Sequence, residues 1–372
     1  MARNILKSPN SFVAMTNSDA AFHEMAKVGP PVLGTDLNLY NTVQSCTYSV
    51  GFSRQNLKQL GSQAFVSREF FNQPDVQLSL SYIPDPSINN EIYGLFCGAG
   101  AVSGFVNFFS GRLEASTNFY VFNTPDQHND AFSTHNSLFE FGSPIKLSGW
   151  DIISFGNCFP TTYGLTYGVG ALPIVSTSYI CSNMEYQTPV GTSGSSPAIN
   201  LASGNKNGAG PQVFNFNYGK TDPQIVNQNE ESSSITLQNL QVGGQNISGT
   251  HFIQALDMSV DLPRVSNYGL GSDFAYGRKA ALPANGKFSV SSLVSGLYSG
   301  ELTGVLGSDS GYNFELVLAS SGVDTKMIYQ IEDAKLISYN YSMPVNGKMT
   351  FDAEFSFEVT ETKGLKFSGT TY

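Results

Sequence analysis

The chain has 372 residues, of which 13% are charged and 12% aromatic, while Gly and Pro occupy 37 + 17 = 54 positions. This mixture favours strands separated by turns over helical bundles, and the hydrophobic fraction of 41% excludes wholesale disorder. No apolar run approaches the roughly 20 residues of a membrane-spanning helix, and a net charge of −10 without Lys or Arg clusters disfavours tight binding to nucleic acids.

The first nine residues contain a short apolar element but no sustained hydrophobic region and no small-residue cleavage site. We therefore expect no signal peptide, folding in the cytoplasm and no membrane partner. The four cysteines have no metal-type spacing, so reduced and packed thiols are expected. With only four histidines and no further ligand set beside Asp126–Asp130, we predict no metal and no cofactor.

An internal repeat begins at residue 49. Adding 210 to each number carries residues 49–94 onto residues 259–304 without a gap, and eleven positions are identical, where unrelated segments would share roughly three or four. The register also keeps apolar positions on apolar positions, which indicates a duplication. The identical positions in the first copy are Ser49, Val50, Arg54, Leu60, Gly61, Ser62, Arg68, Ser79, Ser81, Glu91 and Gly94.

The match continues with smaller offsets further along the chain. Asn118-Phe119 corresponds to Asn313-Phe314 at an offset of 195, and residues 155–184 correspond to residues 331–360 at an offset of 176. The first copy therefore carries 210 − 176 = 34 extra residues, which fall between Cys97 and Phe155. We interpret the stretch 97–155 as an insertion that forms a surface loop.

Strands and turns follow from the alternation of side chains. Residues 256–262 and 351–359 alternate apolar and polar side chains, which predicts half-buried antiparallel strands. Asn346-Gly347 between alternating runs predicts a terminal hairpin, and Gly168–Ala171 predicts its counterpart in the first copy. One short helix per copy is predicted, near residues 89–96 and 299–306.

Segments rich in Gly, Ser, Pro and Asn lie between the copies, at residues 188–197 and 202–211. Such composition is typical of linkers and exposed loops. We predict a first domain over residues 1–188, a linker and extended loop region over residues 189–250, and a second domain over residues 251–372.

The order of these features resembles phage tail tube (major tail) proteins. It comprises Ser-Val, Arg, Leu-Gly-Ser and Arg, an alternating strand, a short helix, and the terminal hairpin from Ala334 to Phe351. The resemblance covers roughly residues 43–188 and 253–362. It implies a mainly β fold made of two tandem tail-tube-like β-sandwich or barrel domains, each with one short helix.

The same resemblance implies a structural virion protein of the tail, assembled in the host cytoplasm, that polymerises into stacked hexameric rings around a DNA channel. Two tube domains in one chain imply homotrimeric rings with pseudo-sixfold symmetry. The expected partners are other copies of the chain, other tail proteins, and DNA that passes through the lumen without specific binding. An acidic wall would suit such passage.

Four arginines recur at the offset of 210 and are predicted to make charge-assisted contacts at an oligomer interface. An ordinary exposed arginine that happens to repeat is the alternative for each. The four are Arg54, Arg68, Arg264 and Arg278.

The sequence is also compatible with two other functions. The chain is either another virion ring component, such as a tail terminator or baseplate protein, or a β-sandwich carbohydrate-binding or adhesin module whose aromatic side chains stack on sugars. An enzyme is not expected. Gly98–Gly104 lacks the Gly-Lys-Ser/Thr ending of a phosphate-binding loop, and Gly191–Gly194 lacks the spacing of a nucleophile elbow.

Overall fold

A computed structural model provides the fold, and it contains strands but no helix among the residues that it describes. The protein is therefore mainly β, as the alternating patterns predicted, and its strands are almost entirely antiparallel. The described residues are 11–16, 37–39, 42–51, 54–58, 60, 65–70, 75–84, 105–108, 117–123, 145–146, 151–168, 170–181, 183–187, 213–214, 216–217, 234–236, 241–242, 245–246, 251–267, 277–294, 311–319, 326–343, 345, 347–348 and 350–368.

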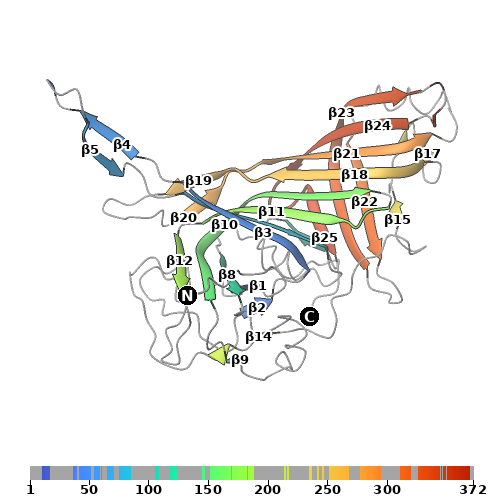
Figure 1. The fold of residues 1–372 in the computed structure, drawn as a ribbon. Coiled ribbons are helices and arrows are strands. Elements are labelled where there is room, and N and C mark those ends of the chain that lie inside the picture. The colour runs from blue at the N-terminus through green and yellow to red at the C-terminus, as the bar shows by residue number, and fades with distance from the viewer. Residues whose placement is uncertain are drawn as a thin grey trace.

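One large antiparallel sheet runs through the whole molecule (Figure 1). Its first four strands come from the first half of the chain and its last four from the second half. In spatial order they are β3 (Val43–Gly51), β6 (Asp75–Tyr82), β11 (Ile174–Cys181), β10 (Asp151–Gly168), β18 (His251–Asp261), β21 (Ala284–Val294), β24 (Thr350–Val359) and β23 (Lys326–Ser342).

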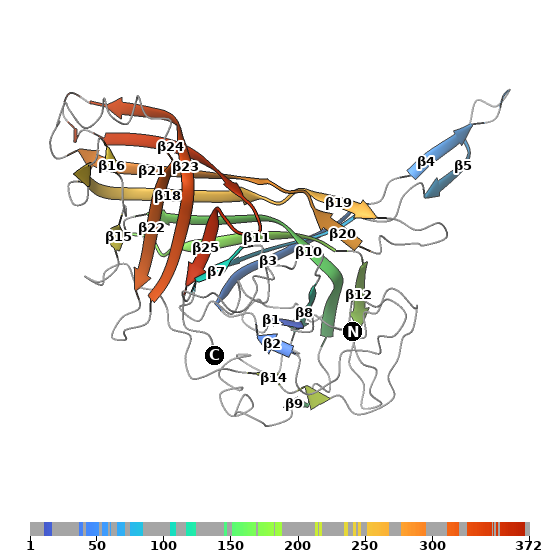
Figure 2. The ribbon, with the colours of Figure 1, turned by 180° about the vertical axis from the view of Figure 1, so that it is seen from behind.

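Two long strands, β10 and β23, each take part in two sheets. The first part of β10 pairs with β8 (Thr117–Asn123) and β12 (Asn183–Gln187). The first part of β23 pairs with β22 (Tyr312–Ala319) and β25 (Leu365–Ser368). Both strands carry β-bulges where they change partners, and bulges bend a strand. Seen from behind, both side sheets leave the large sheet on its lower side (Figure 2).

The remaining strands are short. Those that extend the side sheets are β1 (Ser11–Thr16), β2 (Leu37–Leu39), β14 (Phe216–Asn217), β7 (Phe105–Asn107) and β15 (Ser234–Thr236). Those in separate pairs are β4 (Arg54–Lys58) with β5 (Phe65–Phe70), β19 (Arg264–Asn267) with β20 (Gly277–Ala280), β9 (Ile145–Lys146) with β13 (Val213–Phe214), and β16 (Gln241–Val242) with β17 (Gln245–Asn246). The predicted insertion and linker thus contain strands, and the domain boundaries stay predictions.

Strand pairing follows the same register in both halves. The ladders β3–β6, β6–β11, β10–β11, β8–β10 and β4–β5 of the first half have counterparts in the second half at the offsets read from the sequence, 210, 195 or 176. The bulge in β3 also recurs in β18 at the offset of 210. Corresponding pairs are Gly51↔Asp75 and Asp261↔Asn285, Val76↔Cys181 and Gly286↔Phe357, Phe159↔Ile180 and Lys335↔Ser356, Phe119↔Phe155 and Phe314↔Ile331, and Arg54↔Phe70 and Arg264↔Ala280.

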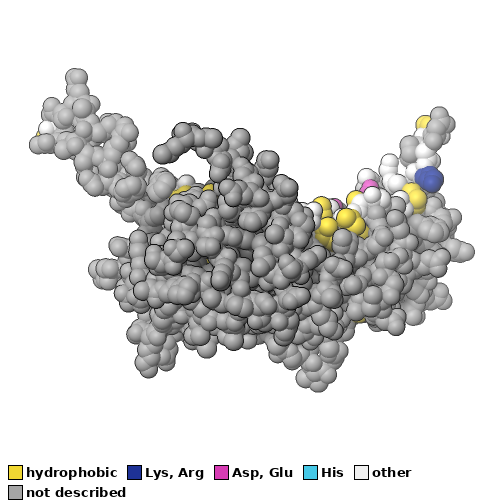
Figure 3. Space-filling view, turned by 60° about the horizontal axis from the view of Figure 1, so that its bottom comes forward, with side chains coloured by type: hydrophobic (Ala, Val, Ile, Leu, Met, Phe, Trp, Pro, Cys, Tyr) yellow, Lys and Arg dark blue, Asp and Glu magenta, His cyan; other side chains and the backbone are white. Residues whose placement is uncertain are grey.

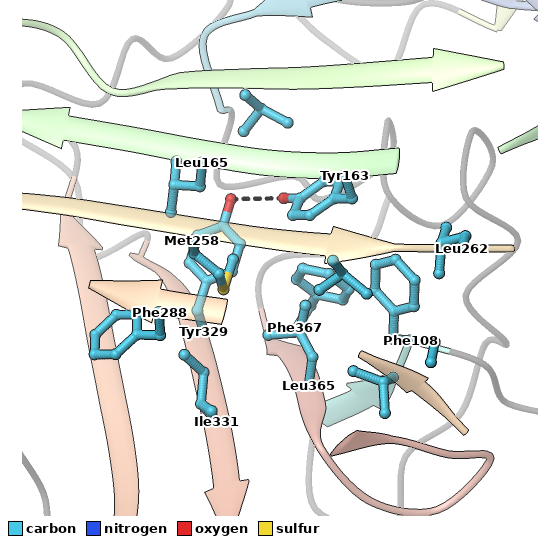
Figure 4. Close-up of a cluster of buried hydrophobic side chains, with 14 of the residues drawn as sticks. Phe108, Tyr163, Leu165, Met258, Leu262, Phe288, Tyr329, Ile331, Leu365 and Phe367 are labelled. Carbon is cyan, nitrogen blue, oxygen red and sulfur yellow. Dashed lines mark hydrogen bonds between the residues drawn. The ribbon is translucent and has the colours of Figure 1, made fainter. Parts of the chain in front are cut away.

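The core lies between the large sheet and the side sheets. Alternate residues of the two predicted strands are buried, which confirms the predicted periodicity; they are Leu256, Met258, Val260 and Leu262 on β18 and its extension, and Ala353, Phe355, Phe357 and Val359 on β24. One hydrophobic cluster includes residues of both halves. Within it, the Tyr163 hydroxyl donates to the Tyr329 hydroxyl over 3.1 Å, which joins β10 to β23 (Figure 4).

Both predicted hairpins are present. The Ala171 amide donates to the Gly168 carbonyl over 3.0 Å, and Gly170 has a φ of +85°, so this turn needs a residue that tolerates the left-handed region. The second hairpin joins β23 to β24, which pair antiparallel. The helices predicted near residues 89–96 and 299–306 lie outside the described residues.

Substitution of Gly364 is expected to destabilise the fold more than substitution of Gly170. Both glycines have positive φ, but a Cβ at Gly364 would collide with the backbone of Glu358 and Val359, whereas a Cβ at Gly170 meets nothing within 4 Å. We expect Gly364→Ala to cost about 3 kcal/mol and Gly170→Ala about 1 kcal/mol of unfolding free energy, measured by urea titration. Equal losses would contradict this expectation.

Candidate assembly interface

The two halves of the chain meet where β10 pairs with β18. This internal junction runs in antiparallel register from Thr162↔Asp261 to Gly168↔Ala255. On the core face, Tyr163 lies opposite Val260 and is 0% exposed. The junction is therefore a complete sheet contact with a dry apolar side, and it shows how one half of the chain recognises the other.

Two of the predicted arginines hold this junction together. Arg264 donates from Nε to the carbonyl of Pro160 over 2.9 Å, and Arg278 donates from an Nη to the carbonyl of Ile180 over 3.2 Å. Both guanidinium groups lie over the ring of Phe159, at 5.8 and 5.9 Å from its centroid, within the range of cation–π attraction. The hairpin β19–β20 of the second half thus clasps two strands of the first half.

The bulge in β10 explains why the clasp is possible. The ladder between β10 and β11 is interrupted between Pro160 and Thr162, and bulges leave backbone groups without a ladder partner. The arginine from β19 satisfies the Pro160 carbonyl. Burial lowers the pKa of Arg264 to about 10, which still leaves it a cation near neutral pH. Arg278 is 5% exposed and also donates from Nε to the Ser266 hydroxyl over 3.1 Å.

The other two predicted arginines occupy the matching hairpin of the first half. In β4–β5, Asn56 pairs with Arg68, just as Ser266 pairs with Arg278 in β19–β20. This hairpin projects away from the body of the molecule (Figure 1), and its side chains lie outside the described part. The contacts of Arg264 and Arg278 are made within one chain, so a role for the four arginines between chains stays a prediction.

The large sheet has two edges. At one edge β3 pairs only with β6, and at the other the second part of β23, residues 335–342, pairs only with β24, as far as the described residues show. Each edge therefore presents a row of backbone groups that another strand can satisfy. We refer to them as the β3 edge and the β23 edge.

Large hydrophobic side chains lie exposed on the core side of both edges. Tyr48 and Tyr339 occupy positions that are buried at the internal junction. Tyr48 is 40% exposed and corresponds to Met258, which is 3% exposed; Tyr339 is 39% exposed and corresponds to Tyr163 at 0%. Met343, at 65%, corresponds to Tyr167. The chain thus keeps large hydrophobic residues at edge positions that stay partly exposed among the described residues of one protomer.

The β23 edge carries a small aromatic cluster. Tyr341 lies 4.9 Å from Phe351 and 6.1 Å from Tyr339, measured between ring centroids. Partial burial raises the pKa of Tyr341, with Tyr339 adding to the effect. Figure 3 shows hydrophobic side chains at the surface, beside the projecting end at the right of the view. In Figure 1 the ends of β23 and β24 lie on this same side of the molecule.

The opposite face of the large sheet is mainly polar. In the first half it bears hydroxyls, with the Ser45 and Ser81 oxygens 2.6 Å apart. In the second half it bears carboxylates, and an open hollow of about 870 Å³ is lined by Asp257, Asp352 and Glu354 with Lys287. Lys287 and Glu354 are 3.6 Å apart and well exposed, a geometry that contributes little to stability. The negative charges of these acidic groups repel polyanions, so polyanions do not bind tightly to this face.

The segments considered for metal or enzyme chemistry lie largely outside the described part of the chain. No group of three or more metal-ligating side chains occurs among the described residues. Asp126–Asp130, Gly98–Gly104, Gly191–Gly194 and Cys97 lie outside them. The other three cysteines carry no disulfide. Burial raises the pKa of the Cys46 thiol to about 11, and that of Cys158 lies well above its usual value for the same reason.

The exposed edge residues were not singled out by sequence reasoning. The signal was present, because adding 210 to Tyr48 and Val50 gives Met258 and Val260, and adding 176 to Tyr163 gives Tyr339. What was missing was the knowledge that β10 pairs with β18, which identifies these positions as contact residues.

No helix among the described residues is long and apolar enough to cross a membrane. Comparison with protein-family models and with curated proteins finds no match to this chain.

Proposed function

We propose that this chain is a structural virion protein that polymerises into the tube of a bacteriophage tail and conducts DNA during ejection. Its assembly unit is a ring of three chains, and rings stack to form the tube. The observation that carries this proposal is the pair of exposed hydrophobic sheet edges, whose counterparts are buried where the two halves of the same chain meet.

A tandem duplication of one β unit is the first element of the proposal. It is supported by the recurrence of strand order, pairing register and bulge positions at the offsets found in the sequence. Each unit comprises four strands of the large sheet, two strands of a side sheet and one projecting hairpin. We take this unit to be the tail-tube-like β domain suggested by the sequence.

Ring closure follows from the two different edges. A contact between the β23 edge of one chain and the β3 edge of the next is head-to-tail, and head-to-tail contacts produce closed rings or open filaments. Because each chain contributes two units, three chains place six similar units around the ring. Closure would bury both edges of the large sheet and their hydrophobic side chains, which removes the hazard of open strands there.

The polar face of the large sheet suits the wall of a DNA channel. It presents hydroxyl groups and carboxylates, and the exposed carboxylates outnumber the lysines around the hollow. Such a wall repels the phosphates of a DNA duplex, so it does not bind the duplex and does not slow its passage. The remaining proposed partners are other tail proteins, which would contact the ends of the tube.

Electron microscopy of negatively stained purified protein tests the proposal directly. We expect hollow tubes or stacked rings, and native mass spectrometry at low concentration is expected to show masses in steps of three chains. A protein that stays dispersed at all concentrations would overturn the proposal. Rings that never stack would instead favour a tail terminator or baseplate protein.

A carbohydrate-binding or adhesin module is the remaining alternative. The hollow on the polar face brings several carboxylates and hydroxyls together, a combination that also suits sugars. A monomeric protein that is retained on a glycan array would favour this alternative. Tubes with no glycan affinity would exclude it.

A further inference from the structure

The internal junction contains the pattern for a contact between two copies of the chain. It joins one β unit to the next through the second part of β10 and the whole of β18. The equivalents of these strands, at the offsets 176 and 210, are the β23 edge and the β3 edge. Both equivalents pair on one side only within the described residues, and they are the edges that carry exposed aromatic side chains.

We propose that two copies join through a junction that repeats the internal one residue for residue, in antiparallel register from Ser338↔Gly51 to Ser342↔Thr47. This inference rests on the proposed self-assembly but not on any role in DNA passage. It places Tyr341 opposite Tyr48, as Leu165 lies opposite Met258.

The side chains brought together fit this register. Tyr339, Tyr341 and Met343 of one copy meet Val50, Tyr48 and Cys46 of the next, so the core side of the new junction is apolar throughout. The polar side brings Asn340 next to Ser49. A shift by one residue would place the exposed aromatic side chains against polar ones, so the alternation itself selects the register.

The projecting hairpin β4–β5 has a defined role in this arrangement. In the second half, β19–β20 places Arg264 and Arg278 on the carbonyls of Pro160 and Ile180. The matching acceptors in a second copy are the carbonyls of Leu336 and Ser356, and Leu336 lies at the repeated bulge. We assign Arg54 and Arg68 to these two carbonyls.

One element of the internal clasp is missing between copies. Phe159, which stacks under both guanidinium groups, corresponds to Lys335. The clasp between copies therefore consists of hydrogen bonds to carbonyls without the aromatic ring. It is weaker than the internal clasp, which suits a contact that must form after the chain has folded.

Cysteine cross-linking tests the register. Ser49→Cys combined with Asn340→Cys places two thiols on facing positions of the polar side, and mild oxidation of assembled protein is expected to yield covalent multimers. The matched control combines Ser45→Cys with Asn340→Cys; Ser45 lies on the same face of β3, four residues and roughly 13 Å away, and is expected to leave single chains.

Arginine variants test the clasp independently. We expect the pair Arg54→Ala and Arg68→Ala to raise the concentration needed for assembly at least tenfold without changing the melting temperature of the dispersed protomer. The pair Arg264→Ala and Arg278→Ala is expected to lower that melting temperature, because its contacts lie within one chain. Equal effects of both pairs on the protomer, or an unchanged assembly concentration for the first pair, would overturn the assignment.

The outcomes separate this inference from the proposed function. Tubes that form in the microscope but cross-link through Ser45, or through neither position, would show that the register is wrong while self-assembly stands. Absence of any assembly by the unmodified protein would remove the proposed function, and the inference with it.

Discussion

Replacing Tyr341 with aspartate is expected to weaken self-association about a thousandfold while leaving the protomer folded. Tyr341 is partly exposed at the β23 edge, so a polar side chain there is tolerated in the single chain. In the proposed junction the same position faces Tyr48 and loses its water. Burial of an unpaired carboxylate costs about 4 kcal/mol, which corresponds to three powers of ten in affinity.

Ser342→Asp provides the matched control for that experiment. Ser342 is the next residue along the same strand, but it lies on the polar face and is exposed. It stays in contact with water in the protomer and in the ring. We expect the concentration at which the Ser342→Asp variant assembles to differ less than threefold from that of the unmodified protein. Analytical ultracentrifugation over a dilution series measures the assembly concentration of both variants. A similar weakening of self-association in the two variants would mean that the apolar side of the edge is not a contact surface.

Removal of the Tyr163 side chain is expected to produce the largest loss of stability in the protomer, about 4 kcal/mol for Tyr163→Ala. Tyr163 is fully buried at the internal junction, and its ring meets those of Phe108 and Phe367 edge-on, with centroids 5.7 and 5.6 Å away. Truncation to alanine leaves a cavity at the place where β10 of the first half meets β23 and β25 of the second half (Figure 4).

Tyr163→Phe separates the packing of the ring from the hydrogen bond. The phenylalanine keeps the aromatic contacts and removes only the hydroxyl that donates to Tyr329, so a loss of about 1 kcal/mol is expected. Unfolding in urea, followed by tyrosine fluorescence at concentrations below assembly, measures both variants. If the phenylalanine variant lost as much as the alanine variant, the hydroxyl pair and not the ring packing would hold this junction.

Local patterns were sufficient to predict two of the main strands of the second half and its terminal hairpin. The alternation over residues 256–262 and 353–359 predicts which face of each strand is buried, because successive side chains on a strand point to opposite sides. The turn at Gly168–Ala171 was predictable for a similar reason, since glycine permits the positive φ found at Gly170. Such features depend on neighbours in the chain and need no knowledge of the fold.

The arginine contacts were only partly predictable. Their recurrence drew attention to Arg264 and Arg278, and both make charge-assisted contacts. Recurrence carried no information about the acceptors, which are the carbonyls of Pro160 and Ile180, 104 and 98 residues away in the chain. A backbone carbonyl has no identity in a sequence, and its availability here depends on a bulge.

Composition and alternation were enough to predict a mainly β fold, the buried faces of its main strands and the offsets between the two halves. The pairing of β10 with β18, which makes one sheet and one core of both halves and leaves β3 and β23 at the edges, became known from the three-dimensional fold. Alternation specifies which face of a strand is buried but not which strand lies beside it. The choice of neighbour depends on bends and bulges that bring distant segments together, and those same features leave Tyr48 and Tyr339 exposed.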